Sequence, residues 1–165
     1  MKRLESSVKA PDRNAQFEEL YAQYADDVLR MAYFYLADKQ KAEDVCQDVF
    51  IKLYTRGENI APGREKAWLL RVTVNHCKNH LASAWFRKRA DLDEGIPALD
   101  NAELEVVSAV AALPAKYRAV VHLYYFEGYS TKEIAEILHS RPNTVSSRLS
   151  RARALLAKAL KEEIV

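Results

Sequence analysis

The strongest constraint on the fold is a pair of helical patterns near the C-terminal end of the sequence, separated by only three residues. Residues Ser130 to Glu133 have the form of a capping box, with serine at the N-cap and glutamate at N3, and predict a helix ending near Leu138. After the turn His139-Ser140-Arg141, Pro142 suits the first position of another helix. The apolar face of that helix comprises Val145, Leu149, Ala152, Leu156 and Leu160. This arrangement predicts a helix-turn-helix unit.

The opposite face of the second helix carries residues suited to duplex DNA. Short polar side chains lie near its N-terminus, and arginines follow a turn or two later. In a recognition helix, short side chains reach the groove floor while arginines contact bases or phosphates. The predicted DNA-contacting residues are Arg141, Asn143, Thr144, Ser146, Ser147, Arg148 and Arg151. An ordinary basic helical hairpin is the alternative, since the turn lacks glycine and His139 or Ser140 must then adopt its unfavourable backbone conformation.

Helical periodicity also extends through the N-terminal half, and no β pattern of any length is present. After a polar, flexible segment over residues 1–14, apolar spacing predicts a helix ending near Tyr35, a second helix after Asp38, and a third over about residues 65–82. Gly57 and the segment Ala61-Pro62-Gly63 mark a loop before the third helix. The predicted fold class is all-α.

An acidic segment separates two helical regions. The net charge of the 165 residues is only +2, but residues 67–90 contain bases and no acid, whereas residues 91–105 contain acids and no base. Those acids are Asp91, Asp93, Glu94, Asp100, Glu103 and Glu105. Together with Gly95 and Pro97, they predict a linker over residues 90–103 between two small helical domains, residues 15–89 and 104–165.

The predicted third helix carries a second set of residues suited to nucleic acid. Amide and basic side chains cluster beside its apolar stripe, and an aromatic and basic segment follows the helix. The candidate residues are Trp68, Arg71, Asn75, Lys78 and Asn79, followed by Trp85, Phe86, Arg87, Lys88 and Arg89. Aromatic rings that stack on bases and cations that hold the backbone suit single-stranded nucleic acid. The alternative is that Trp85 and Phe86 only cap the domain core.

The predicted second helix presents an acidic stripe opposite its buried face. Asp44, Gln47, Asp48 and Ile51 lie at spacings of three, four and seven residues from the first of them. An isoleucine within an exposed acidic stripe indicates a protein docking site. An acidic face that only contacts solvent is the alternative.

Several segments together resemble a known family. They are Ala42 to Leu53, Trp68 to Asn79, Leu113 to Arg118, Tyr129 to Ala135 and Asn143 to Leu149. In this order and spacing, from about Phe17 to Leu160, the chain resembles a bacterial RNA polymerase sigma factor of the extracytoplasmic-function (ECF) type, in the sigma-70 family. The resemblance implies a protein that binds core RNA polymerase and directs promoter-specific initiation at −10 and −35 elements.

The resemblance also implies a role for each surface. Core polymerase would be bound at its β′ clamp helices, through Asp44, Gln47 and Asp48, and at its β flap. The third helix and the segment to Arg89 would bind the unwound −10 element. Trp85 and Phe86 would form the walls of a pocket that captures a flipped base. The recognition helix would read the −35 element as duplex, and the acidic linker would run through the RNA-exit region. A further implied partner is an anti-sigma factor, often membrane-bound.

Two other classes of protein compete with this interpretation. The same helix-turn-helix could serve a repressor or activator that works without polymerase. An enzyme is the other class, because His76 and His80 lie one helical turn apart, but no third ligand is spaced to join them. We therefore expect no catalytic residue, metal, cofactor or small-molecule substrate. The sequence shows neither a signal peptide nor a membrane-spanning run, which predicts a cytoplasmic location.

Overall fold

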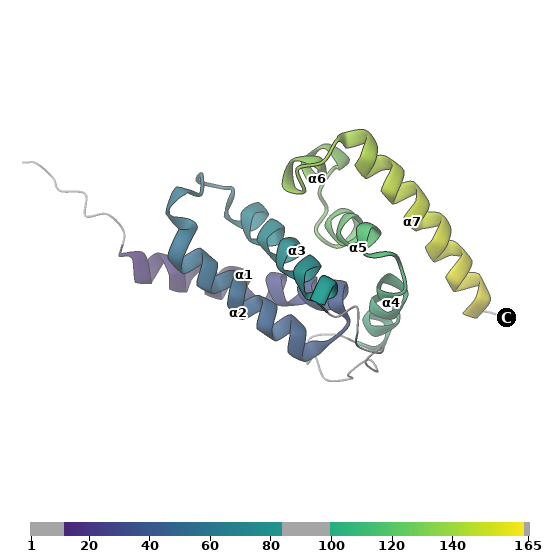
Figure 1. Cartoon of the computed structure of the whole chain (residues 1–165), viewed down its shortest axis with the longest axis horizontal. Helices are drawn as coiled ribbons and strands as arrows, with labels where there is room; N and C mark the ends of the chain where they lie inside the picture. Colours follow the sequence, from purple (N-terminus) through teal and green to yellow (C-terminus); the bar gives the residue numbers. More distant parts are fainter. Residues whose placement is uncertain (1–11, 84–99, 164–165) are drawn as a thin grey trace, which may run out of the picture.

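The computed structural model describes residues 12–83 and 100–163, and the regular structure in these ranges is helical (Figure 1). One bundle consists of α1 (Arg13–Leu36), α2 (Lys39–Arg56), the short 3₁₀ turn η1 (Gly57–Asn59) and α3 (Glu65–Ser83). The other consists of α4 (Asn101–Ala111), α5 (Ala115–Val121), the π-helical turn η2 (His122–Phe126), α6 (Thr131–Ile137) and α7 (Pro142–Glu163). The predicted all-α class is confirmed for these residues.

Aspartates set the beginnings of the first two helices. The side chain of Asp12 accepts a hydrogen bond from the backbone of Asn14, so α1 begins at Arg13, within the segment expected to be loose. Asp38 caps α2 in the same way, accepting from the backbone of Lys41. The helix predicted after Asp38 is confirmed, since α2 begins at Lys39.

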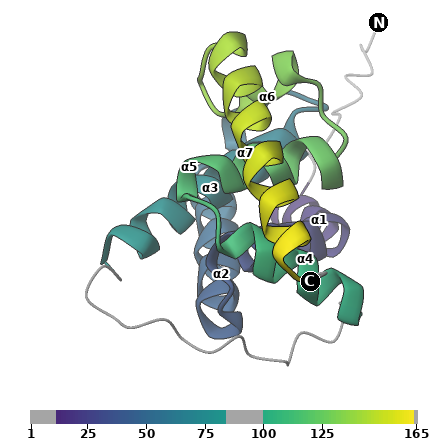
Figure 2. The same cartoon turned by 90° about the vertical axis from the view of Figure 1, so that its right-hand side faces the viewer.

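A stretch near the C-terminal end of α1 is buried on every side. The five consecutive residues from Met31 to Tyr35 are at most 2% exposed. Consecutive residues point in all directions around a helix, so a single partner face cannot cover them. α1 contacts α2 and α3 of its own bundle and also α4 and α5 of the other bundle, and Figure 2 shows α4 beside α1. The two bundles therefore pack directly on each other.

The start of α4 changes the interpretation of the acidic segment. Asp100 and Glu103 form a reciprocal capping box, in which each side chain accepts a hydrogen bond from the other residue's backbone. Two of the five acids within the predicted linker, residues 90–103, therefore initiate a helix. Residues 84–99, which include most of that segment, lie outside the described residues.

The helix-turn-helix geometry is confirmed. Ser130 and Glu133 form the predicted capping box of α6. Gly128, with φ of +73°, ends the preceding helical segment as expected of a residue just past a helix. His139 adopts the unfavourable turn conformation, with φ of +50°, and the backbone of Ser140 donates to Ala135 at 2.9 Å. The turn therefore forms without a glycine.

Candidate nucleic-acid interface

The recognition helix α7 presents its predicted polar face to solvent. Val145, Leu149 and Ala152 are buried against the rest of the second bundle, at most 2% exposed. On the opposite side, the predicted contact residues are exposed or half-buried: Arg141, Asn143, Thr144, Ser146, Ser147, Arg148 and Arg151. Five of these share one surface, because an open cavity of about 400 Å³ is bordered by Asn143, Thr144, Ser147, Arg148 and Arg151.

Two residues of α5, Lys116 and Tyr117, border the same cavity and were not predicted from the sequence. The ammonium group of Lys116 lies 5.1 Å from the centre of the Tyr117 ring, and the lysine is exposed whereas the tyrosine is buried. Their helix packs on α7. Proximity across separate helices leaves no spacing pattern in the sequence. The segment Leu113 to Arg118 entered only as part of the family resemblance, with no role for either side chain.

The second candidate surface lies on α3. Asn75, Lys78 and Asn79 are exposed, or nearly so, while Trp68 and Arg71 are half-buried. The predicted apolar stripe of α3 consists of Leu70, Val74, Cys77 and Leu81; the first three are buried and Leu81 is half-buried against the core. The remaining candidates, Trp85, Phe86, Arg87, Lys88 and Arg89, lie outside the described residues.

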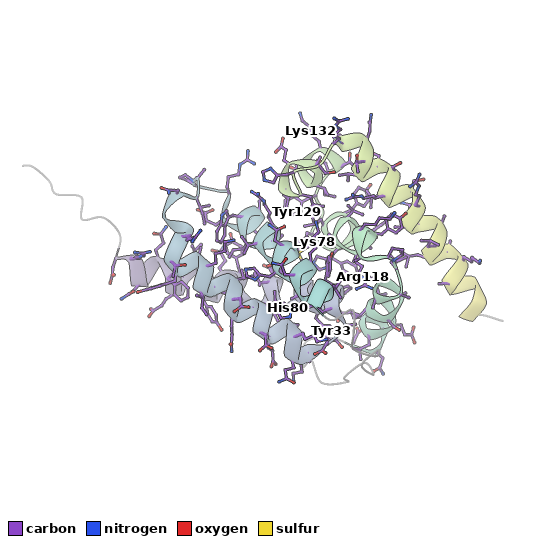
Figure 3. The ribbon with its side chains drawn as sticks, in the orientation of Figure 1. Tyr33, Lys78, His80, Arg118, Tyr129 and Lys132 are labelled. Atoms are coloured by element: carbon purple, nitrogen blue, oxygen red, sulfur yellow. The ribbon has the colours of Figure 1, made fainter. Side chains whose placement is uncertain are left out.

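Lys78 and Arg148, assigned by sequence to two different DNA elements, line one cavity. It has a volume of about 330 Å³ and lies between the bundles, with Tyr35, Lys116 and His139 also in its wall. Figure 3 marks Lys78 on the helix α3. Burial raises the pKa of the Tyr35 hydroxyl to about 12, against the opposing charges of Arg118 and Arg148. Three cationic side chains border this cavity, those of Lys78, Lys116 and Arg148.

The acidic stripe of α2 is exposed for most of its length. Asp44 and Asp48 are exposed, and Ile51 has 60% of its surface accessible. Neither Asp44 nor Asp48 forms an ion pair within the parts of the chain that the structure describes. An acidic stripe of this kind around an exposed isoleucine has the composition of a docking surface.

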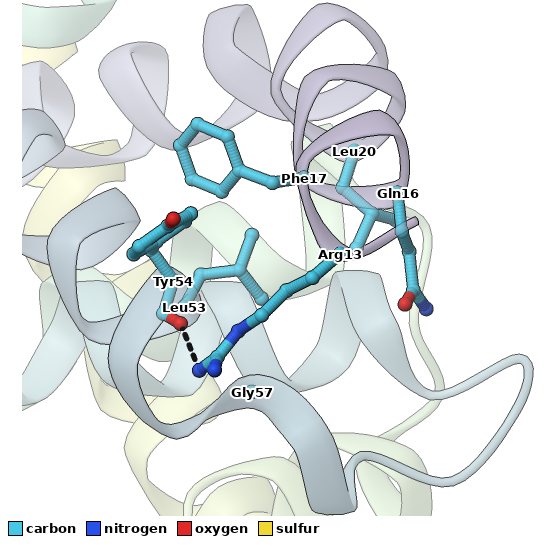
Figure 4. Close-up of a pocket in the computed structure, with 7 residues that line it drawn as sticks. All are labelled: Arg13, Gln16, Phe17, Leu20, Leu53, Tyr54 and Gly57. Atoms are coloured by element: carbon cyan, nitrogen blue, oxygen red, sulfur yellow. Dashed lines mark hydrogen bonds between the residues drawn. The ribbon is translucent and has the colours of Figure 1, made fainter. Parts of the chain in front are cut away.

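A small cavity between α1 and α2 has a structural role. It is bordered by Arg13, Phe17, Leu53 and Tyr54 among others and holds only about 40 Å³ (Figure 4). Ligand sites in proteins usually measure about 300–1,000 Å³. The guanidinium of Arg13 donates to the backbone oxygen of Tyr54 at 2.6 Å, which ties the start of α1 to the end of α2.

The cysteines and histidines do not form a reactive or metal-binding cluster in the described ranges. No group of three His, Cys, Asp or Glu side chains there could hold a metal ion. Both cysteines are free thiols. Burial raises the pKa of Cys77 to about 12 and is the main reason that the pKa of Cys46 is about 11. Because the thiolate is the reactive form of cysteine, these raised pKa values disfavour that form at neutral pH.

None of the helices in residues 12–83 and 100–163 is both long enough and apolar enough to cross a bilayer.

Two family descriptions match the chain, one on each bundle. Sigma-70 region 2 matches residues 20–87, and Sigma-70 region 4 matches residues 103–156. The RNA polymerase sigma-H factor of Pseudomonas aeruginosa is 32% identical, over 93% of this chain and 90% of that protein. The ECF RNA polymerase sigma factor SigM of Mycobacterium tuberculosis is also 32% identical, over 92% of this chain and 80% of that protein.

Solved structures share the arrangement of helices. The sigma factor RpoE of Bartonella quintana, crystallised with the anti-sigma factor NepR, superposes with a TM-score of 0.75 at 22% identity, over 88% of this chain and 97% of that chain. CnrH, in complex with the cytosolic domain of CnrY, gives a TM-score of 0.71 at 26% identity, over 90% of each chain.

The chain therefore belongs to the sigma-70 family of RNA polymerase sigma factors, in its ECF group. It binds core RNA polymerase and promoter DNA and directs promoter-specific transcription initiation. The helix-turn-helix that α6 and α7 form is the region 4 part of that machinery.

Proposed function

We propose that the exposed stripe of α2 binds core polymerase at the β′ clamp helices. Asp44, Gln47, Asp48 and Ile51 would make the contacts, with the isoleucine buried at the centre and the carboxylates paired to basic residues of the partner. The observation that carries the proposal is the combination of 60% exposure at Ile51 with flanking carboxylates that lack ion pairs in the described chain. The β flap is the second polymerase contact that the family resemblance implies.

Replacing Asp48 with arginine is expected to weaken binding to core polymerase by about tenfold or more, because like charges at a docking surface repel. Fluorescence anisotropy of labelled protein titrated with core enzyme measures the effect. Glu19→Arg is the matched control, since Glu19 is an exposed acid of α1 outside the stripe. Equal affinities for all three proteins would show that the stripe only contacts solvent.

For promoter recognition, we assign the −10 element to α3 and its following segment. Trp68, Arg71, Asn75, Lys78 and Asn79 would hold the unwound strand, together with residues 85–89. We assign the −35 element to α7, where Arg141, Asn143, Thr144, Ser146, Ser147, Arg148 and Arg151 would face the duplex. The first assignment lies in the bundle of α1 to α3 and the second in the bundle of α4 to α7, which begins at Asn101 rather than at residue 104.

Lys116 is proposed as an additional contact to a phosphate of the −35 duplex. It borders the same cavity as Arg148 and Arg151. Its charged ammonium group can pair with a backbone phosphate, a contact that does not depend on the base sequence. Lys116→Ala is expected to weaken −35 binding about equally for matched and mismatched sequences, and to reduce the slope of log affinity against log salt by about one. A loss confined to the matched sequence would instead assign Lys116 to base recognition.

An anti-sigma factor is the further proposed partner. RpoE, which shares the fold, was crystallised with the anti-sigma factor NepR, and the structure of CnrH is in complex with the cytosolic domain of CnrY. In this proposal the chain works in the cytoplasm with polymerase, and a membrane-bound anti-sigma factor holds it inactive until a signal arrives. Affinity capture of the tagged protein from the membrane fraction and, in parallel, from the soluble fraction tests whether a membrane-bound partner holds the chain.

A further inference from the structure

The cavity that Lys78 and Arg148 share has an apolar wall on α5. Ala115 and Ala119 lie one helical turn apart there and border the cavity together with Leu138, at the end of α6. Because alanine side chains are short, they leave a space of about 330 Å³ unfilled. This volume falls within the range of about 300–1,000 Å³ that is usual for ligand sites. The cavity is therefore large enough for a small molecule.

The charged groups that border the cavity are all cationic. Lys78 comes from α3, Lys116 from α5 and Arg148 from α7, and no carboxylate lies among the described residues of the wall. None of the three cations forms an ion pair with a described residue. Charges of one sign around a concave surface focus the electric field and concentrate ions of opposite sign there. The cavity therefore has the electrostatics of an anion-binding site.

Tyr35, in the last turn of α1, adds a buried hydroxyl to the same wall. The residue is 2% exposed, and its hydroxyl forms no hydrogen bond to another described residue. Buried polar groups usually have a partner. The guanidinium of Arg118 donates to the backbone oxygen of Tyr35 at 2.7 Å, which holds this turn in place. Burial raises the pKa of Tyr35 to about 12, so the hydroxyl keeps its proton at neutral pH and can donate to an anion.

The donors around the cavity favour phosphate as the anionic group. A guanidinium such as that of Arg148 can donate two parallel hydrogen bonds to phosphate oxygens, and lysine ammonium groups bind phosphate as point charges. The hydroxyls of Tyr35 and Ser140 are further donors in the wall. One phosphate would fill only a small part of about 330 Å³. A compact anion with linked phosphates therefore matches both the donors and the space.

We propose that this cavity binds a compact anion with two or more linked phosphates, held by Lys78, Lys116 and Arg148 and by the hydroxyl of Tyr35. Duplex DNA does not account for such a site, because a duplex is too wide to enter a cavity of this volume and reach Tyr35. The inference goes beyond the proposed DNA contacts, in which Tyr35, Ala115 and Ser140 have no part.

Isothermal titration calorimetry of the full chain with inorganic pyrophosphate, in metal-free buffer, measures binding at this site. We expect one pyrophosphate per chain and weaker binding of orthophosphate. Lys116→Met and Arg148→Met should each lower the affinity for pyrophosphate by about tenfold or more, because each variant loses a charged hydrogen bond. Tyr35→Phe, which removes only the hydroxyl, should lower the affinity several-fold.

Lys132→Met is the matched control for charge. Lys132 is an exposed base of α6 that does not border the cavity, and Figure 3 shows it away from Lys78. Ala115→Leu tests the shape of the site, because leucine fills the cavity without changing any charge. Ala115 does not border the second cavity, along α7. Ala115→Leu should therefore abolish pyrophosphate binding and leave binding of duplex DNA unchanged. Circular dichroism confirms the folding of each variant.

Three results would overturn the anion site. They are the absence of saturable pyrophosphate binding, an equal loss of affinity in Lys132→Met and Arg148→Met, and an unchanged affinity in Ala115→Leu. The second would mean that only the overall charge of the chain attracts pyrophosphate, and the third would place the anion outside the cavity. Citrate, a tricarboxylate, that bound as tightly as pyrophosphate would overturn the assignment to phosphate.

Discussion

Arg118→Met is expected to lower the free energy of unfolding by about 2–4 kcal/mol, because it removes three hydrogen bonds that a charged donor makes to backbone oxygens. Methionine keeps much of the aliphatic length of the arginine side chain, so most of the decrease in the free energy of unfolding comes from loss of the guanidinium. Urea denaturation followed by circular dichroism measures the change. Only the planar guanidinium of arginine can donate to three carbonyl groups at once, so Arg118→Lys should be more stable than Arg118→Met but less stable than the wild type.

Lys116→Met provides the control for this experiment. Lys116 lies two residues away on the same helix, is exposed, and has its ammonium group near the Tyr117 ring. Its replacement should change stability by less than about 0.5 kcal/mol, as is usual for surface substitutions. Similar decreases for the two variants would contradict the structural role of Arg118.

Replacing Arg148 or Arg151 with alanine should weaken −35 recognition by about 1–3 kcal/mol for each base that the arginine reads, or about 5- to 150-fold. Each variant should also discriminate less at the base pair that its arginine reads. Transcription by the reconstituted holoenzyme from promoters with single −35 substitutions measures both effects. The reason is geometric, because a guanidinium reads guanine through two parallel hydrogen bonds that a smaller side chain cannot make.

Arg153→Ala is the control on the same helix. The guanidinium of Arg153 lies over the rings of Tyr124 and Tyr125, away from the recognition cavity. Its removal should leave the preference for −35 sequences unchanged. If all three variants kept the wild-type preference, the recognition face would be misassigned.

Features that depend on neighbouring residues were predictable from the sequence. The capping box at Ser130 and Glu133 and the helix start at Pro142 follow from local backbone chemistry. The lack of a turn glycine predicted an unfavourable conformation at His139 or Ser140, and the structure places it at His139. The apolar stripes of α3 and α7 follow from helical spacing. These features were enough to predict which face of α7 is exposed and polar.

Pairs of distant residues were not predictable in the same way. The partner of Lys66 is 61 residues away in Glu127, and Arg118 finds the Tyr35 carbonyl at a separation of 83 residues. Nothing in local spacing indicates such pairs. The uninterrupted apolar run from Met31 to Tyr35 did carry information, because it exceeds what one helix face can bury. Asp100 was likewise assigned to a linker because its charge, rather than its capping geometry, dominated the pattern.

The most direct test of the account is transcription by core polymerase from a library of randomised promoters, with and without the purified chain. The account predicts that specific transcripts depend on the chain and share two upstream elements at a fixed spacing. Asp48→Arg should lower their yield through weaker core binding, and Arg148→Ala should weaken −35 recognition and alter its preference while core binding is unchanged. Tight duplex binding by the chain alone, with transcripts that do not depend on it, would contradict the account and identify a repressor or activator instead.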